Sequence, residues 1–123
     1  MASEQLIRDL ELYKYFVVEI GIRQAWPFVT FASNVEGDHP DIRLNIDSGF
    51  TVTGIDPKGS TGEEDDDELW VRRLLEVNNL TLQRGTIEPD RSLVLTFDDG
   101  IRLRINGTPA PWTTHDIWWL VSL

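Results

Sequence analysis

The two histidines come first among the residues that could carry out chemistry, because each has an aspartate beside it. His39 stands in the segment Asp38-His39-Pro40-Asp41, and His115 is followed by Asp116. Such a pair can serve acid–base catalysis or bind a metal ion, but a metal site needs a second histidine on the same helix face or a further group of ligands. The sequence shows neither arrangement. We therefore expect a turn at His39, a half-buried ring at His115, no catalytic residue and no metal site.

Motifs for other chemistries are missing from the sequence. There is no Gly-x-Ser-x-Gly elbow for a serine nucleophile and no glycine-rich phosphate loop. The chain has no cysteine, which removes disulfides, thiolate nucleophiles and iron–sulfur clusters. We expect a protein that is not an enzyme and that needs no cofactor.

A run of acidic residues is the most distinctive charged feature. Its members are Glu63, Glu64, Asp65, Asp66, Asp67 and Glu68. Carboxylates in the first turn of a helix interact favourably with the helix dipole, and consecutive ones lack the alternate spacing of a calcium-binding loop. Six in succession exceed what a helix start can use. We interpret the run as a surface that attracts a basic protein partner, against the simpler alternative of a solvated loop and helix start.

The charge and hydropathy of the whole chain limit its partners further. Twenty-one acidic and eleven basic residues give a net charge of −10, which disfavours nucleic acid because phosphate backbones require clustered lysines and arginines. The opening residues lack the features of a signal peptide, and no stretch approaches the about 18 apolar residues of a membrane span. We expect a cytoplasmic protein that contacts no membrane.

Five tryptophans could line a ligand pocket, although such residues more often fill a core or an interface. The last segment, residues 115–123, carries apolar side chains on both faces of a predicted strand, since Ile117, Trp119 and Val121 alternate with Trp118 and Leu120. A strand of this kind is covered on both sides or takes part in a contact. We predict a homodimer, with a self-association surface or pocket at Trp112, His115, Trp118 and Leu120.

The sequence resembles itself at a shift of 51 residues. Residues 28–53 then lie over residues 79–104 without a gap, and their apolar positions coincide. The identical pairs are Thr30 with Thr81, Leu44 with Leu95, Asp47 with Asp98, and Gly49 with Gly100. This agreement predicts an internal duplication.

Each copy of the predicted duplication reads as a three-stranded antiparallel meander. In the second copy, Asp98-Asp99-Gly100 separates two alternating runs, which favours a tight turn with positive φ at its central residues. Asp47-Ser48-Gly49 takes the same place in the first copy. Candidate strands at residues 26–34 and 79–87 come before the two hairpins. We therefore expect equivalent hairpins with positive φ at Gly49 and Gly100.

Two helices are predicted outside the strands. Residues 63–77 place Trp70, Val71, Leu74, Leu75 and Val77 on one face, and Asn78-Asn79 follows as a stop. A short N-terminal helix opens at Ser3 and buries Leu6, Ile7 and Leu10. Residues 15–22 alternate as a strand would, with Phe16, Val18, Ile20 and Ile22 on one face, but they could also continue that helix.

These elements predict a single domain over residues 1–123, mainly β (α+β). Two duplicated antiparallel β-meanders would form a small sandwich or barrel-like core, with one central helix and the short N-terminal helix. The segment from Leu93 to Ile105, followed by a tryptophan-containing stretch, resembles a family of small uncharacterised bacterial proteins frequent in actinobacteria. That family implies no activity. The pattern is also similar to that of small toxin-immunity proteins.

The composition and these resemblances lead to one main expectation of function. We expect a non-enzymatic protein-interaction domain with an acidic surface, for instance a toxin-neutralising immunity protein. The alternative is a small-molecule-binding or purely structural domain with a tryptophan-lined cavity.

Overall fold

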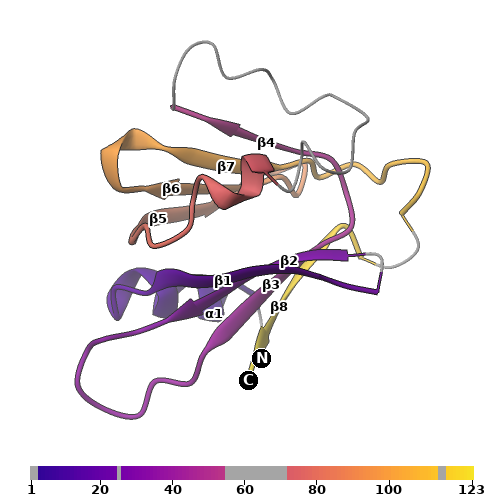
Figure 1. Cartoon of the computed structure of the whole chain (residues 1–123). Helices are drawn as coiled ribbons and strands as arrows, with labels where there is room; N and C mark the ends of the chain where they lie inside the picture. The colour runs from indigo at the N-terminus through magenta and orange to yellow at the C-terminus, as the bar shows by residue number, and fades with distance from the viewer. Residues whose placement is uncertain (1–2, 25, 55–71, 114–115) are drawn as a thin grey trace.

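A computed structural model of the chain describes residues 3–24, 26–54, 72–113 and 116–123 (Figure 1). The acidic run, His115, Trp70 and Val71 lie outside these residues. Residues 72–75 are helical. The other elements are α1 (Ser3–Leu12), β1 (Phe16–Arg23), β2 (Trp26–Ala32), β3 (Ile42–Ile46), β4 (Phe50–Thr53), β5 (Leu82–Ile87), β6 (Leu93–Phe97), the short 3-10 helix η1 (Asp98–Gly100), β7 (Arg102–Ile105) and β8 (Trp118–Ser122).

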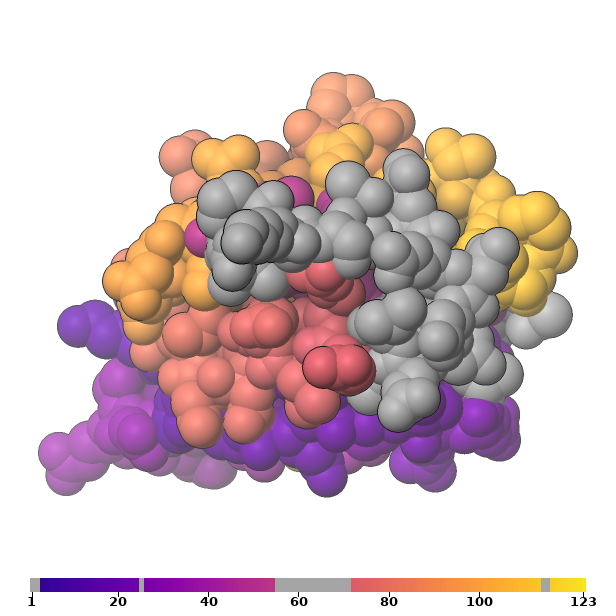
Figure 2. Space-filling model, turned by 45° about the horizontal axis from the view of Figure 1, so that its top comes forward, coloured from indigo at the N-terminus to yellow at the C-terminus, as the bar shows by residue number. Residues whose placement is uncertain are grey.

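The strands form two four-stranded antiparallel sheets, so the expected mainly β class is confirmed. The first sheet has the order β1-β2-β3-β8 and the second the order β4-β7-β6-β5. The sheets lie face to face as two layers and do not close into a barrel (Figure 1). In the space-filling view, the indigo and purple first sheet and the salmon and orange second sheet remain distinct layers (Figure 2).

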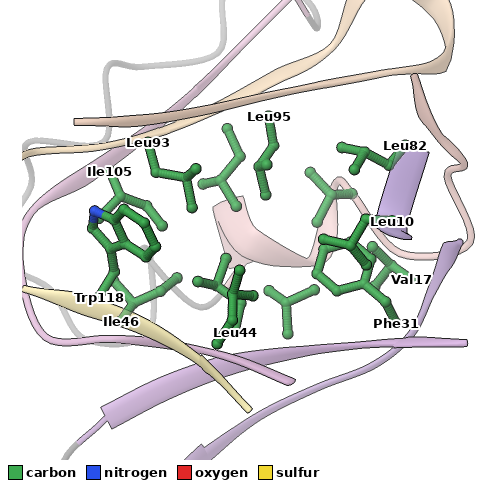
Figure 3. Packing of buried hydrophobic residues seen from close by; sticks show 14 of the residues in the cluster. Leu10, Val17, Phe31, Leu44, Ile46, Leu82, Leu93, Leu95, Ile105 and Trp118 are labelled. Atoms are coloured by element: carbon green, nitrogen blue, oxygen red, sulfur yellow. The ribbon is translucent and has the colours of Figure 1, made fainter. Parts of the chain in front are cut away.

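The core fills the space between the two sheets. Leu93, Leu95 and Ile105 point from the second sheet toward Leu44 and Trp118 of the first (Figure 3). At 25 cal/mol or so per Å² of apolar surface, burial of these large side chains is the main stabilising contribution. Because alternate residues of a strand face opposite ways, the same pattern fixes which residues point outward.

α1 lies across one side of this core. It packs against β5 and β8, which are the edge strands of different sheets. Leu6, Ile7 and Leu10 are buried, as the amphipathic pattern predicts. The helix therefore covers apolar surface that the two sheets leave between their edges.

A second connection joins the sheets at the β1 edge. The Val17 amide donates to Leu80 O (3.0 Å), and the Leu82 amide donates to Tyr15 O (2.9 Å). These bonds link β1 to the residues that enter β5. They also satisfy main-chain groups at the edge of the first sheet, where unpaired groups would favour aggregation.

The expected first hairpin is wrong. Residues 47–49 do not join paired strands: β3 belongs to the first sheet and β4 to the second. The Asp47 amide donates to Ile117 O (2.9 Å), and the Asn106 amide donates to Gly49 O (2.8 Å). Gly49 has no positive φ. The segment is a crossover between the layers, held beside the second crossover that leads from β7 to β8.

The second hairpin is confirmed. β6 and β7 pair antiparallel, with Leu95 opposite Leu103. At the turn, Asp99 has φ 62° and Gly100 has φ 75°, which are the positive values that strand twist demands. Local turn chemistry thus decides the structure here.

The two repeat segments therefore share strand positions but not strand pairing. β3 and β6 occupy equivalent positions at the 51-residue shift, and both bury alternate residues. Val29 pairs with Leu44, whereas Leu95 pairs with Gly85 rather than with Leu80. The prediction of two similar meanders is wrong, because β4 leaves the sheet of β2 and β3, whereas β5, β6 and β7 stay in one sheet.

β1 resolves the ambiguity of residues 15–22 in favour of a strand, with a different inner face from the predicted one. A bulge falls between Val17 and Glu19. Val17 is fully buried opposite Phe31, while Val18 and Ile22 are exposed. The extra residue at the bulge shifts the alternation, and a simple period-2 pattern cannot show this.

The end of the predicted central helix is confirmed in the described residues. After residues 72–75, a turn brings Asn79 to φ 68°, a left-handed value typical of a helix end. Leu74 and Val77 are buried, but Leu75 is half exposed, so its assignment to the apolar face is wrong.

Candidate functional site

The residues predicted for self-association or a pocket lie in different places. Trp118 and Leu120 point into the core and are 2% and 9% exposed. They are not available for an intermolecular contact, which corrects that part of the prediction. Trp112 lies in the β7–β8 connection and is 63% exposed.

Trp118 has a structural role in the core. Its Nε1 donates to Arg91 O (2.7 Å), and the Arg91 guanidinium lies 5.8 Å from the ring centroid. The indole thus fills apolar space while its one polar group is satisfied. This contact fixes the start of β8 against the turn between β5 and β6.

The outer side of the first sheet presents a different group of side chains. Residues directly opposite one another in an antiparallel pair share a face, so the register places them together. We call this set the aromatic face: Glu19, Gly21, Arg23, Trp26, Phe28, Thr30, Arg43, Asn45, Trp119 and Val121.

Phe28 is the central residue of the aromatic face. It is only 9% exposed, yet among the described residues it is the one buried hydrophobic residue outside the core cluster between the sheets. A Cβ at Gly21 would lie 2.6 Å from Phe28 Cζ, so the ring rests on that glycine. The Arg43 guanidinium covers the ring at 4.4 Å from its centroid. Phe28 is therefore buried by neighbours on its own face.

Arg43 is held in place by two neighbouring strands. Its Nε donates to Thr30 Oγ1 (3.1 Å), and its terminal nitrogen donates to Glu19 Oε1 (3.2 Å). Thr30 Oγ1 donates to the same Glu19 oxygen (3.0 Å). The Arg43 side chain is 19% exposed and that of Glu19 is 53% exposed, so the pair is only partly shielded and adds little stability. Its main effect is to order both side chains.

Trp26 and Trp119 form the end of the aromatic face. Their rings meet edge to face, with centroids 5.4 Å apart and an interplanar angle of 82°. Both residues are half buried, and Val121 is exposed on the same strand as Trp119. The face thus offers ordered aromatic surface to solvent.

The described residues do not assemble a catalytic or metal site. His39 stacks on Tyr13 with centroids 4.0 Å apart, and its Nε2 lies 3.2 Å from Glu36 O. Within the described ranges, no group of three or more His, Asp or Glu side chains could hold a metal ion. The tryptophans of the described chain do not line one cavity, because Trp118 lies in the core and Trp112 in a loop.

Comparisons of the whole chain with other proteins give no relative in which the aromatic face could be examined. No known protein family, curated protein or solved structure matches this chain. The resemblances noted from the sequence stay predictions, as does the homodimer. None of the helices in the described part of the chain has the length and apolar character needed to cross a membrane.

Sequence reasoning missed Phe28, Arg43 and Glu19. The signal for Phe28 was present, since Trp26-Pro-Phe28-Val-Thr-Phe31 is apolar on both strand faces. The same two-sided pattern was recognised in β8, where Trp119 and Val121 form the outward set. Arg43 and Glu19 become a pair only through strand register.

Proposed function

We propose that this protein is a non-enzymatic protein-interaction domain that binds a basic protein partner through the aromatic face. The support comes from Phe28, an aromatic ring buried on the solvent side of the sheet and outside the core. Its neighbours Trp26, Trp119 and Arg43 are of the residue types that contribute most binding energy in protein interfaces. They lie on three adjacent strands of the first sheet, β2, β3 and β8.

The order of these side chains favours binding. Arg43 is fixed by Thr30 and Glu19, and the two tryptophans fix each other. A partner would therefore immobilise few free side chains, and each such immobilisation costs about 0.5–1.5 kcal/mol. Rigid aromatic anchors with satisfied polar neighbours suit recognition better than catalysis.

The charge distribution supports a basic partner. The face carries two arginines, of which Arg43 is already paired with Glu19 and Arg23 lies at the end of the face, opposite Trp26. The β2–β3 connection at one end of the sheet exposes Glu36, Asp38 and Asp41, and the whole chain carries a net charge of −10. Complementary charge raises the rate of encounter with a basic protein. The acidic run Glu63–Glu68 would add to this steering.

The resemblance to toxin-immunity proteins suggests a specific form of this function. An immunity protein that neutralises a basic toxin needs a rigid, acidic domain with an ordered contact surface. The alternative of a tryptophan-lined ligand cavity has less support, because the described tryptophans are dispersed between core, sheet face and loop.

The test compares Trp119, which is half buried on the aromatic face, with Trp112, which is exposed in the β7–β8 connection. The full chain, Trp119→Thr and Trp112→Thr are immobilised and exposed to lysate of the native cell. A partner is purified and its affinity for each chain is measured by calorimetry. Loss of a hot-spot side chain costs about 2 kcal/mol or more, so Trp119→Thr should weaken binding by about 30-fold, whereas Trp112→Thr should not. Equal affinities for all three chains would overturn the proposal.

A further inference from the structure

The outer side of the second sheet differs from the aromatic face. Register places four threonines, three arginines and a single apolar residue there. We call this set the arginine face: Thr51, Thr53, Arg84, Thr86, Val94, Thr96, Arg102 and Arg104. Figure 2, in which the top of Figure 1 comes forward, shows salmon and orange atoms of the second half of the chain at the surface.

None of the eight residues of the arginine face is acidic, although the chain has 21 acidic and only 11 basic residues, and the carboxylates of Glu88 and Asp90 reach the face only at Arg104. Threonine and arginine are common on the exposed side of a sheet. An outer sheet face without an acidic residue of its own is unusual for a protein with so large an excess of acidic residues. Screening limits the influence of distant carboxylates, because the Debye length is about 8 Å at physiological salt. A ligand close to Arg84 and Arg102 therefore meets two positive charges that no carboxylate of the described residues pairs.

Only one of the three arginines is engaged. Arg104 forms an ion pair with Glu88, lies 3.9 Å from Asp90 and donates to Ser92 Oγ (3.2 Å). Arg84 and Arg102 are exposed, and no residue in the described ranges forms an ion pair with either. Their guanidinium groups are free to bind carboxylates in the fork geometry that arginine favours.

We propose that the arginine face binds an extended acidic segment of a partner protein. Arg84 and Arg102 both pair with Thr96, one from each side, so they are two strand spacings apart, about 10 Å. Alternate residues of an extended peptide repeat at about 7 Å, a difference that two long side chains accommodate. The hydroxyl of Thr96, which lies between the two arginines, can donate one further hydrogen bond to the segment. Two free arginines on an acidic protein are too few for a nucleic acid backbone.

This site is independent of the aromatic face, because the two faces are the opposite outer sides of the sandwich (Figure 1). The Trp119→Thr variant therefore serves as a control that should bind the acidic segment normally. If no partner binds the aromatic face, the arginine face can still bind an acidic segment. If the arginine face binds no acidic segment, the aromatic face can still bind a partner.

The probe is a capped octapeptide of alternating Glu and Thr, titrated into the full chain at low salt and followed by amide chemical shifts. We expect saturable shifts in β5, β6 and β7 and none in β2 or β3. Binding should weaken several-fold when salt is raised to 300 mM or so, since the contacts are exposed. A peptide of alternating Lys and Thr should produce no saturable shift.

The double variant Arg84→Gln with Arg102→Gln should lower the affinity for the octapeptide at least about fivefold. This loss corresponds to exposed charge contacts of less than 1 kcal/mol each. Arg8→Gln with Arg23→Gln removes the same charge from α1 and β1 and should leave affinity unchanged. Replacement of Arg84 and Arg102 by lysine should restore part of the binding and confirm that the chain folds. Equal weakening by both glutamine pairs, or the absence of saturable shifts at millimolar peptide, would overturn the proposal. An oligothymidylate that binds more tightly than the octapeptide and shifts the same amide signals would also overturn the proposal.

Discussion

Phe28 shows how a single side chain is accommodated on the solvent side of a sheet. Gly21 provides the space beneath the ring, and Arg43 covers it from above. An aromatic residue packed across a glycine of the neighbouring strand protects the main chain that the glycine leaves bare. The half-buried rings of Trp26 and Trp119 beside it belong to the surface that we assign to a partner.

Two glycines should respond differently to a new side chain. A Cβ at Gly107 would lie 2.0 Å from Asp90 O, whereas a Cβ at Gly100 meets nothing within 4 Å. Gly100→Val should lower the free energy of unfolding by roughly 1 kcal/mol or more, because φ is 75° there. Gly107→Ala should cost more, about 3 kcal/mol, since main-chain atoms must move. Urea unfolding of both variants checks the order, and a smaller loss for Gly107→Ala would contradict the packing.

Tyr15 should ionise late. Burial, and then the charges of Asp9 and Asp41, raise the pKa of Tyr15 above its ordinary value of 10.0. The folded state favours the neutral phenol. Its contribution to the free energy of unfolding is therefore complete below pH 10.0 and is lost as pH rises beyond that value. In an alkaline titration followed by phenolate absorbance, Tyr15→Phe should remove signal that develops above pH 10.0. Removal of signal from below that pH would contradict the burial.

At the scale of elements, the turn from β5 to β6 is tied to β7 by acidic side chains. The pKa of Asp90 is lowered by hydrogen bonds from the Ser92 main chain and side chain, and by Arg104. A depressed carboxyl pKa stabilises the fold above the ordinary value of 3.8, and this contribution is lost as pH falls below it. Asp90→Asn should therefore lower the urea midpoint at pH 6 or so, with a smaller difference from the parent near pH 3. If the difference in urea midpoint between Asp90→Asn and the parent became larger at acid pH, the lowered pKa of Asp90 would be contradicted.

The elements also show what sequence reasoning can reach. α1, the β6–β7 hairpin and the helix end at Asn79 depend on nearby residues, and they were predictable from local patterns. The β3–β4 connection was not, because the partner of β3 is β8 and the partner of β4 is β7. A turn motif favours a hairpin only when its flanking strands pair with each other, and distant pairing decides that.

In the candidate site, too, some features depend on nearby residues and others on distant strand pairing. The outward position of Trp119 was visible as two-sided apolar character in residues 115–123. The grouping of Phe28, Arg43 and Glu19 needed the register of three strands and the bulge in β1. Pairing register between strands is not encoded in any short segment.

At the scale of the whole molecule, the acidic run should act on the rate of association with a basic partner. Exposed charges steer encounter and are screened by salt. Replacement of Asp65, Asp66 and Asp67 by asparagine should slow association several-fold at low salt and matter less at high salt, with the fold intact. Stopped-flow rates across a salt series check this. A rate equal to that of the parent at every salt concentration would contradict the steering role.

The most direct test of the account is the calorimetric affinity of a purified partner for the parent chain and for two single variants. Trp119→Thr removes a ring from the aromatic face, and Trp112→Thr removes the exposed ring of the β7–β8 connection. We predict that Trp119→Thr loses about 30-fold in affinity while Trp112→Thr binds as the parent does. Unchanged affinity for Trp119→Thr, in a chain shown to be folded by its circular dichroism, would contradict the assignment of the aromatic face as the binding surface.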